Sequence, residues 1–500
     1  MVPMSASPAS SSSSGQQKVR ELLAAARAQI QQNQLPAAAQ SYLAVIRLQP
    51  DCFEAQAQLG AILNQAGQFA GAAECLTRAL QLQPRFPNLN LLLGGVYKKL
   101  GRFAEAAQCC RREIEITPNN ADGPYNLGLV LQNLAAPGEA AAAYRRALEL
   151  RPDFVDALIN LGTLERALVN LPAALSHLAA AVRLAPQNAE ARWEWGTTLL
   201  AAGDFERGWP EYEWRWRQPD FQTPIPGLAA PRWEGAELHG RRILLYAEQG
   251  YGDSLQFVRY VSLVAARGGR VVLVCAAPLR SLFETVPGVE LVATNPAQIP
   301  PCEVQASLMS LPFIFKTTLA TIPAGIPYLT VPSQGFTLGP AAGNRRRIGL
   351  VWAGRPTHRN DRRRSLPFAA LSGLIETVEV DWFSLQVGAP AAELAALVER
   401  NTITNLEGQL NDFGDTARAI IQMDLVIAVD TAVAHLAGAL GKPVWLLLPY
   451  EAEWRWLVGR SDSPWYPTMR LFRQSQPGDW AEVIERVRRE LAALPTSVRA

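Results

Sequence analysis

Apolar and small residues recur every 34 positions over the first two fifths of the chain. A leucine or tryptophan followed by glycine keeps this spacing at Leu59-Gly60, Leu93-Gly94, Leu127-Gly128, Leu161-Gly162 and Trp195-Gly196, and prolines share the register at Pro50, Pro84, Pro118, Pro152 and Pro186. Within a copy, Gly67-Gln68-Phe69 and Gly101-Arg102-Phe103 are typical of a turn between two helices, because glycine ends a helix easily. At the glycine position the later copies carry Ala135, Val169 and Gly203.

A 34-residue helix-turn-helix repeat is the signature of tetratricopeptide repeats. The copies run over 17–50, 51–84, 85–118, 119–152, 153–186 and 187–219, which predicts an array of five to six repeats over 17–219. One helical hairpin cannot bury its apolar stripe alone, so we expect the copies to stack into a superhelix with a concave groove. Such a groove favours a protein or peptide partner.

The last copy is rich in tryptophan. It carries Trp193, Trp195, Trp209, Trp214 and Trp216, and Trp233 follows. Two interpretations fit this cluster: the indoles bury the end of the array against the next domain, or they stack on a ligand.

A different pattern follows the Pro- and Gly-rich linker at 220–240. Apolar runs at 242–247 and 271–274 flank an amphipathic stretch at 254–267, and further runs lie at 348–352, 381–385, 425–429 and 444–448. Strand, helix and strand at this spacing predict parallel sheets. We therefore expect two Rossmann-like halves, at 241–340 and 345–475, and a closing helix and tail at 476–500. Ligands of such sheets bind at the carboxyl ends of the strands, so a cleft between the halves is the predicted site.

Composition excludes several classes of function. There are 47 basic and 45 acidic residues and the net charge is +2, which argues against nucleic acid or an anionic membrane as a general partner. No apolar stretch is long enough for an integral membrane segment. The six cysteines lack metal-ligand spacing, which predicts reduced thiols, a cytoplasmic location and no metal site. Residues 1–16 predict a disordered leader. Arginine runs at 345–347 and 362–364 fit a solvated loop or a site for an anionic small molecule.

The segment from Glu248 to Ser254 follows the first strand and opens a helix. A dinucleotide fingerprint would need glycine at position 255, where this chain has Leu255, so a dehydrogenase is excluded. Asp253 at this turn could accept a proton from an attacking hydroxyl, or it could cap the helix. Spacing alone leaves both roles open.

A second segment, from Val429 to His435, also joins a strand to a helix. Asp430 or Thr431 could cap the helix, and the N–H groups of Ala432 and the next residues would face a phosphate. His435 lies four residues after Thr431 and could hydrogen-bond the same group. The alternative is a capped helix with a buried histidine.

Taken together, these motifs resemble the heptosyltransferase-type glycosyltransferases. The resemblance rests on 244–257, on Trp352-Ala353-Gly354 with His358, Asn360-Asp361 and Arg364-Ser365, and on Val429-Asp430-Thr431 with Ala434-His435-Leu436. It implies a GT-B fold, metal-independent transfer with inversion, and a nucleotide-sugar donor, UDP-, GDP- or ADP-linked, held by the C-terminal half. Asp253 matches the family's general base, and Asp430, Thr431 and His435 match its donor-diphosphate segment. Ala432 stands in that segment where the family has glycine, and Arg364 lies near the family's phosphate-binding lysine; both are also expected to bind the donor phosphate. The cleft would be lined by Gln249, Gly250, Gly252, Trp352, Gly354, His358 and Asn360.

The predicted function is a glycosyltransferase without cofactor or metal whose repeats recruit a protein or peptide acceptor. Its layout is similar to that of O-GlcNAc transferases. The alternatives are a non-catalytic repeat scaffold with a degenerate transferase-like domain, and an enzyme that acts on a glycan or lipid. Rocking about the linker near Pro340 would close the cleft. Five further residues, Trp454, Arg455, Trp456, Trp465 and Tyr466, fit either the donor pocket or the core.

Overall fold

The computed structural model describes residues 9–219, 221, 230–332, 336–339, 345–357, 360–377, 380–400 and 402–494. These residues form two compact units. The first comprises residues 1–168 and 172–186, and the second comprises 169–171 and 187–500. Helical repeats come first and parallel-sheet α/β halves follow, so the predicted fold class is confirmed.

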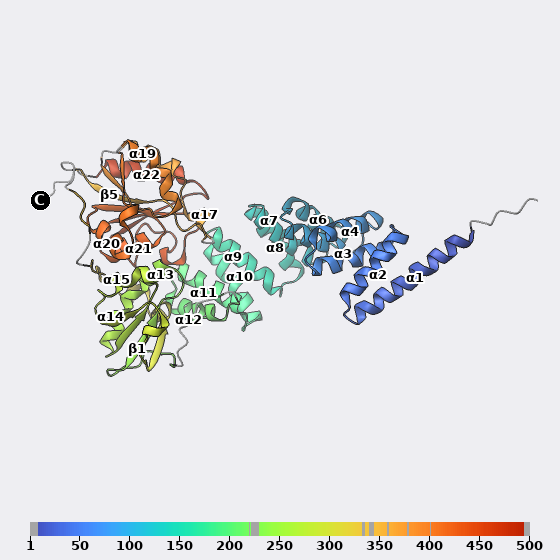
Figure 1. The fold of residues 1–500 in the computed structure, drawn as a ribbon, viewed down its shortest axis with the longest axis horizontal. Coiled ribbons are helices and arrows are strands. Elements are labelled where there is room, and N and C mark those ends of the chain that lie inside the picture. The colour runs from blue at the N-terminus through green and yellow to red at the C-terminus, as the bar shows by residue number, and fades with distance from the viewer. Residues whose placement is uncertain are drawn as a thin grey trace, which may run out of the picture. The chain divides into compact units, whose positions relative to one another are not determined.

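The helices of the first unit form successive antiparallel pairs (Figure 1). They are α1 (Ala9–Gln31), α2 (Leu35–Leu48), α3 (Phe53–Gln65), α4 (Phe69–Leu82), α5 (Leu89–Lys99), α6 (Phe103–Ile116), α7 (Asp122–Asn133), α8 (Pro137–Leu150), α9 (Val155–Ala167) and α10 (Leu171–Leu184). The pairs match the predicted repeats. The leader prediction is wrong from residue 9 onward, because α1 begins at Ala9 and continues into the first repeat.

The repeat pattern follows from close helix packing and from tight turns. A Cβ atom on Gly128 would lie 2.6 Å from the ring of Tyr144, and one on Gly162 would lie 2.6 Å from Leu178. Glycine therefore lets the two helices of a pair approach each other. The turn position is left-handed in every copy that we aligned, with φ of +74° at Gly67, +54° at Ala135 and +62° at Val169.

The sixth helix pair belongs to the second unit. It consists of α11 (Ala189–Ala201) and α12 (Phe205–Tyr212), and the short helix η1 (Glu213–Arg217) follows. Phe205 stacks on Trp465, and Trp209 packs edge-on against Trp454. This burial confirms the packing interpretation for Trp209. It also moves the boundary between compact units from the predicted residue 219 to 186/187.

The N-terminal half is a parallel sheet of four strands in the order β3-β2-β1-β4. Its strands are β1 (Arg242–Tyr246), β2 (Arg270–Val274), β3 (Val289–Ala293) and β4 (Val304–Ser307). Its helices are α13 (Tyr251–Phe257), η2 (Val258–Tyr260), α14 (Val261–Ala266), η3 (Ala277–Leu279), α15 (Arg280–Phe283), η4 (Pro296–Gln298), η5 (Leu308–Ser310), α16 (Leu311–Ile314) and η6 (Leu319–Thr321). The end of the predicted linker joins this half, since Trp233 is buried and its backbone N–H bonds to Gln305 on β4.

The C-terminal half is a parallel sheet of six strands in the order β10-β9-β8-β5-β6-β7. Its strands are β5 (Arg347–Val351), β6 (Asp381–Ser384), β7 (Ile403–Asn405), β8 (Leu425–Val429), β9 (Val444–Leu448) and β10 (Met469–Arg473). Its helices are α17 (Asp361–Arg364), α18 (Ala369–Thr377), η7 (Ala389–Leu394), α19 (Ala395–Glu399), η8 (Glu407–Gln409), α20 (Phe413–Ile421), α21 (Ala432–Ala439), η9 (Trp454–Trp456) and α22 (Trp480–Ala492). The predicted strands and the closing helix are present; β7 and β10 were not predicted.

The two halves share one buried core that also includes α12. The Arg259 guanidinium donates a hydrogen bond to the carbonyl of Trp465 at 2.8 Å, and the backbone N–H of Tyr328 donates to the carbonyl of Ala439 at 3.1 Å. Helix α13 packs directly on α21. A rocking motion would have to break these contacts. Its predicted hinge, Pro340, lies outside the described residues.

All six cysteines are free thiols. Burial raises the pKa of Cys109 to about 11 and that of Cys275 to about 12, so these thiols stay protonated. Within the described ranges, no helix is both long and apolar enough to cross a membrane.

Opposite substitutions at two of the left-handed turn positions measure the backbone strain there. A β-branched side chain in this region is strained by roughly 1–2 kcal/mol, so we expect Val169→Gly to stabilise the chain by about 1 kcal/mol and raise the melting temperature. Gly67→Val is the matched reverse change, since a Cβ there meets nothing within 4 Å. It should destabilise through backbone strain alone. Melting followed by circular dichroism checks both variants, and a drop in stability for Val169→Gly would contradict the argument.

Candidate functional site

Asp253 lies in the first turn of α13, just after strand β1. Its Oδ2 atom accepts a hydrogen bond from the backbone N–H of Gly250 at 3.0 Å. Gly250 is the residue that caps the helix, so Asp253 stands three residues inside it. The carboxylate therefore stabilises the first turn of the helix through its hydrogen bond to the N-cap residue. A carboxylate has about four lone-pair positions, so this bond leaves it able to accept others.

Arg455 of η9 joins this carboxylate to the C-terminal half. Its Nη2 atom lies 2.5 Å from Asp253 Oδ1, and its Nη1 atom lies 3.4 Å from Glu453. The side chains of Arg455 and Asp253 are only 9% and 15% exposed. Removing one partner of a buried ion pair of this kind lowers the stability of the folded protein by about 3–5 kcal/mol.

Asp430 follows strand β8 and lies close enough to Arg455 to feel its charge. Its Oδ2 atom accepts a hydrogen bond from the indole N–H of Trp456 at 2.9 Å, and its carbonyl accepts one from Arg364 at 3.0 Å. Gly354 allows this approach, because a Cβ there would lie 2.6 Å from the Arg364 guanidinium. Asp430 and Arg364, which were predicted to share a site, are thus in contact.

Thr431 begins helix α21 in extended conformation, but its side chain does not cap the helix. Its hydroxyl oxygen is buried and has no hydrogen-bond partner among the described residues. Thr431 and Ala432 are half-buried as residues. A buried hydroxyl without a partner is costly, by about 1–3 kcal/mol. Together with the free N–H groups at the start of α21, it suits an anionic ligand.

His435 is buried beneath this helix start. Its Nδ1 atom lies 2.9 Å from the Tyr466 hydroxyl, and a Cβ on Gly252 would lie 2.8 Å from its ring. Its Nε2 atom lies 3.8 Å from Asp430 Oδ1. Burial, and then the charges of nearby arginines, hold the pKa of His435 well below its usual range, so the ring is neutral. This is the arrangement of the buried-histidine alternative.

The carboxyl groups of Asp253 and Asp430 both have a raised pKa. Burial raises the pKa of Asp253 and the pKa of Asp430, and the charge of Arg455 offsets part of each rise. A raised carboxylate pKa suits proton transfer near neutral pH.

The remaining predicted cleft residues are divided. Gln249 and Gly250 are exposed beside Asp253, and Asn360 is exposed at the start of α17. The prediction for Trp352 is wrong, because its side chain is buried in the core on one face of the C-terminal sheet. His358 lies outside the described residues.

The sequence left two roles open for Arg455 and Trp456, one in the donor pocket and one in the core. In the structure both residues lie in the core and also neighbour the site. Five residues of this region, Trp454, Arg455, Trp456, Trp465 and Tyr466, are buried. Arg455 lies 202 positions from Asp253 in the chain. An arginine between two tryptophans was the available signal, since a guanidinium there needs a buried partner.

The part of the chain that the structure describes contains no group of three or more His, Cys, Asp or Glu side chains placed to hold a metal.

Parts of the chain match models of known protein families. The model for glycosyltransferase family 9 (heptosyltransferase) matches residues 384–450, which include Asp430 and His435. Tetratricopeptide repeat models match residues 63–123, and residues 23–74 and 125–189. The chain is thus similar to tetratricopeptide repeats over its N-terminal part and to glycosyltransferase family 9 over residues 384–450. Of the donor-side candidates, Asp430, Thr431, Ala432 and His435 lie within the matched region, while Arg364 and the proposed base Asp253 lie outside it.

Relatives cover only parts of the chain. Protein FlbA of Caulobacter vibrioides (strain ATCC 19089 / CIP 103742 / CB 15) is 29% identical over 330 residues, covering 58% of this chain and 53% of that protein. The chain thus spans about half the length of this relative. Crystal structures of MamA (21% identity, TM-score 0.32) and of YrrB, a TPR protein with an unusual peptide-binding site (23% identity, TM-score 0.32), cover 33% and 36% of this chain and 96% and 94% of their own.

The raised pKa of Asp430 gives stability a defined pH dependence. A carboxyl group with a folded pKa above its unfolded value, near 3.8, favours folding at acid pH, and that contribution is lost as pH rises through the folded pKa. Asp430→Asn keeps an oxygen for the Trp456 N–H and removes the titration. We expect its stability relative to wild type to increase from pH 4 to pH 8 in urea unfolding.

Asp462→Asn is the matched control with the opposite sign. A hydrogen bond from Arg460 lowers the pKa of the exposed Asp462. Its variant should therefore lose a little stability at pH 8 and recover it toward pH 3. Parallel pH profiles for the two variants would contradict the assignment of Asp430 as a buried carboxylate.

Proposed function

We propose that this chain is an inverting, metal-independent glycosyltransferase that moves a sugar from a nucleotide donor to a protein or peptide acceptor. One observation carries the proposal. Asp253 of the N-terminal half meets Arg455 of the C-terminal half beside Asp430, within or next to the region that matches glycosyltransferase family 9.

In this proposal Asp253 is the general base. The acceptor hydroxyl attacks the anomeric carbon from the face opposite the diphosphate, the bond to the diphosphate breaks, and the proton passes to Asp253. Its burial raises its pKa, which supports the role, and Arg455 and the Gly250 N–H fix its orientation. A positioned base contributes typically about 10²–10⁴-fold to the rate.

The departing nucleoside diphosphate would be stabilised by groups of the C-terminal half. Arg364 is held beside the start of α21, where the Thr431 hydroxyl lacks a partner among the described side chains and backbone groups. Guanidinium groups and helix N-terminal N–H groups stabilise phosphate charge without a metal. The UDP, GDP and ADP forms are candidate donors. His435 would act through Tyr466 and the packing of α21, because it is buried.

The repeats would supply the acceptor. Tetratricopeptide arrays commonly bind extended polypeptides in a concave groove, which favours a protein or peptide substrate. The last helix pair shares a core with both halves of the transferase region, which supports a repeat array that is built into the enzyme.

The base assignment predicts a large rate effect. Asp253→Asn should lower sugar transfer or donor hydrolysis by about 10²–10⁴-fold, because the amide cannot accept the proton. Release of nucleoside diphosphate from a panel of UDP-, GDP- and ADP-sugars measures this, with acceptor candidates captured by the full chain.

Glu284→Gln is the control, since Glu284 is exposed and pairs only with Arg280 on its own helix in the described structure. Thermal shift with nucleoside diphosphates verifies that the Asp253 variant still binds the donor product. Unchanged transfer by Asp253→Asn would refute the base assignment, and no release by the wild type from any donor would favour the scaffold alternative.

The unpartnered hydroxyl predicts a separation of stability from binding. Thr431→Val should leave stability equal or higher, because it removes a buried hydroxyl without a partner. It should weaken nucleoside diphosphate binding by about 10-fold or more, because hydrogen bonds to charged groups contribute about 1.5–3 kcal/mol. Calorimetric titration and unfolding measure the two quantities.

Thr416→Val is the matched control. The Thr416 hydroxyl is buried and donates to the carbonyl of Asp412 at 2.9 Å. Its loss should lower stability and leave binding unchanged. If Thr431→Val destabilised the chain and bound nucleotide normally, Thr431 would be a structural residue.

A further inference from the structure

A cavity of about 500 Å³ lies where the last repeat meets the N-terminal half. It is lined by Glu213, Trp214, Trp216, Arg217, Arg232, Tyr246, Gln305, Ala306, Ser307 and Ser310. Tyr246 ends β1 and Ser307 ends the neighbouring strand β4. After β1 the chain adds β2 and β3 on one side of the sheet and then places β4 on the other side of β1, so the strand order switches direction between β1 and β4. The carboxyl edge at such a switch point is where α/β sheets commonly bind ligands, and the volume is in the range of small-molecule sites.

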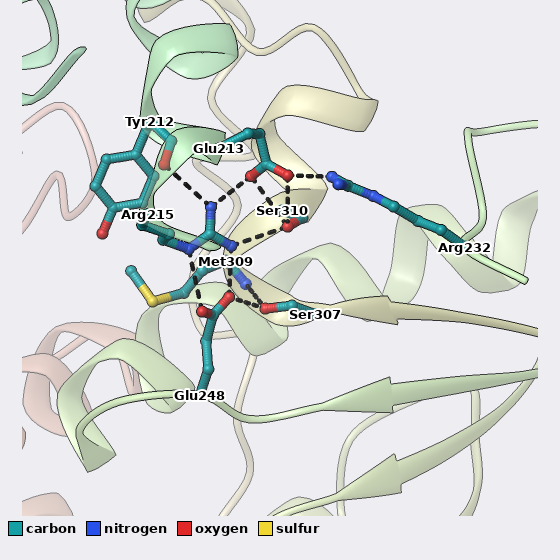
Figure 2. Close-up of polar contacts among 8 residues, drawn as sticks. All are labelled: Tyr212, Glu213, Arg215, Arg232, Glu248, Ser307, Met309 and Ser310. Atoms are coloured by element: carbon teal, nitrogen blue, oxygen red, sulfur yellow. Dashed lines mark hydrogen bonds and ion pairs between the residues drawn. The ribbon is translucent and has the colours of Figure 1, made fainter. Parts of the chain in front are cut away.

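A buried charge network, called the floor here, adjoins the lining residues Glu213, Ser307 and Ser310, and Figure 2 shows its contacts. Arg215 donates to Glu248 at 2.6 and 3.1 Å, to Ser310 at 2.9 Å and to Glu213 at 2.5 Å. The Arg215 and Glu248 side chains are 1% and 0% exposed. Ser307 also donates to Glu248. Since every charge has a partner, the floor is rigid and holds Ser307, Ser310 and Glu213 in place.

The mouth of the cavity carries positive charge. Glu213 pairs with both Arg215 and Arg232, and Figure 2 shows Arg232 on the side of Glu213 that faces away from Arg215. Burial would raise the pKa of Glu213, but the two arginines outweigh it and lower that pKa, so the carboxylate is ionised. Arg217 is exposed, stacks on Trp214 at 4.1 Å and makes one long hydrogen bond of 3.4 Å to Gln187. Two lining arginines against one lining carboxylate leave one excess positive charge.

The walls are aromatic. Trp216 meets the ring of Tyr246 edge-on, and both Trp214 and Trp216 are half-buried. Rings of this kind pack against the C–H groups of a cyclic ligand, while guanidinium N–H groups hold a carboxylate or phosphate in a fork.

The edge of the sheet is closed to an extended peptide. Residues before Trp233 already pair with β4, because Gln305 accepts from the Trp233 N–H at 2.8 Å and donates to the Pro231 carbonyl at 2.9 Å. Strand addition at this edge is therefore blocked, and recognition must use side chains. This favours a compact ring over a polypeptide.

We propose that this cavity binds an acidic sugar, whose ring packs against the aromatic wall of Trp216 and Tyr246 and whose carboxylate or phosphate is held by Arg217 and Arg232. The site is distinct from the residues around Thr431. Binding there needs neither a nucleotide nor catalysis, so its test is independent of the transferase proposal. Through Glu248, its floor adjoins the loop that carries Asp253.

The test is calorimetric titration of the full chain without nucleotide. The probes are glucuronate, glucose 6-phosphate, glucose, inorganic phosphate and an acidic peptide. We expect at least one of the two acidic sugars to bind about 10-fold or more tightly than glucose and phosphate, and comparison of the two identifies the preferred anion. Equal binding of glucose, tightest binding of the peptide, or no binding of either acidic sugar would overturn the proposal.

Variants locate the binding. Arg232→Gln and Arg217→Gln should each weaken binding of the acidic sugar about 10- to 100-fold and leave glucose binding unaffected, since glucose has no anionic group for either guanidinium to hold. Arg232→Lys should restore part of the affinity. Arg400→Gln is the control, because Arg400 is exposed and pairs with Glu376 in the C-terminal half. Melting curves confirm folding, and unchanged affinity in both glutamine variants would place the ligand elsewhere.

Discussion

The second unit depends on one aromatic contact surface. Phe205 and Trp209 of the last repeat pack against Trp454 and Trp465 of the C-terminal half, and Phe257 of the N-terminal half packs against both of these indoles. Aromatic pairs contribute about 0.5–1.5 kcal/mol each beyond the area that they bury. Because helix α12 touches both halves, the last repeat is part of the core that the two α/β halves share.

The polar chemistry is built around this core. Arg455 follows Trp454 directly, so burying the indole brings the guanidinium to Asp253 and Asp430. Arg215 follows Tyr212 by one turn and reaches Glu248 at the end of β1. Both arginines are buried and paired, which makes each a fixed point for a carboxylate. The turn with Asp253 and the cavity beside the last repeat are thereby attached to one shared core.

The elements that depend on local periodicity could be predicted from the sequence. The 34-residue register located the helix pairs, and apolar runs located most strands, because both patterns are set by neighbouring residues. Strands β3, β4, β7 and β10 were missed, since strands of three or four residues or a mixed sequence such as Met469–Arg473 give little alternation. The predicted partners Asp430 and Arg364 meet, whereas Trp352 belongs to the core and His435 lies beneath the helix start. Spacing along a strand or helix cannot tell which face is covered.

By itself, the sequence determined the order of the parts: helical repeats, then two parallel α/β halves with a carboxylate after β1 and another after β8. Those features follow from contacts within a few tens of residues. Tertiary structure alone decided that Arg455 would pair with Asp253, that the Thr431 hydroxyl would find no partner among the described residues, and that Trp216, Arg232 and Ser307 would line a cavity. These residues are brought together by packing across domains, and no local pattern encodes the burial that pairs a charge or leaves a space unfilled.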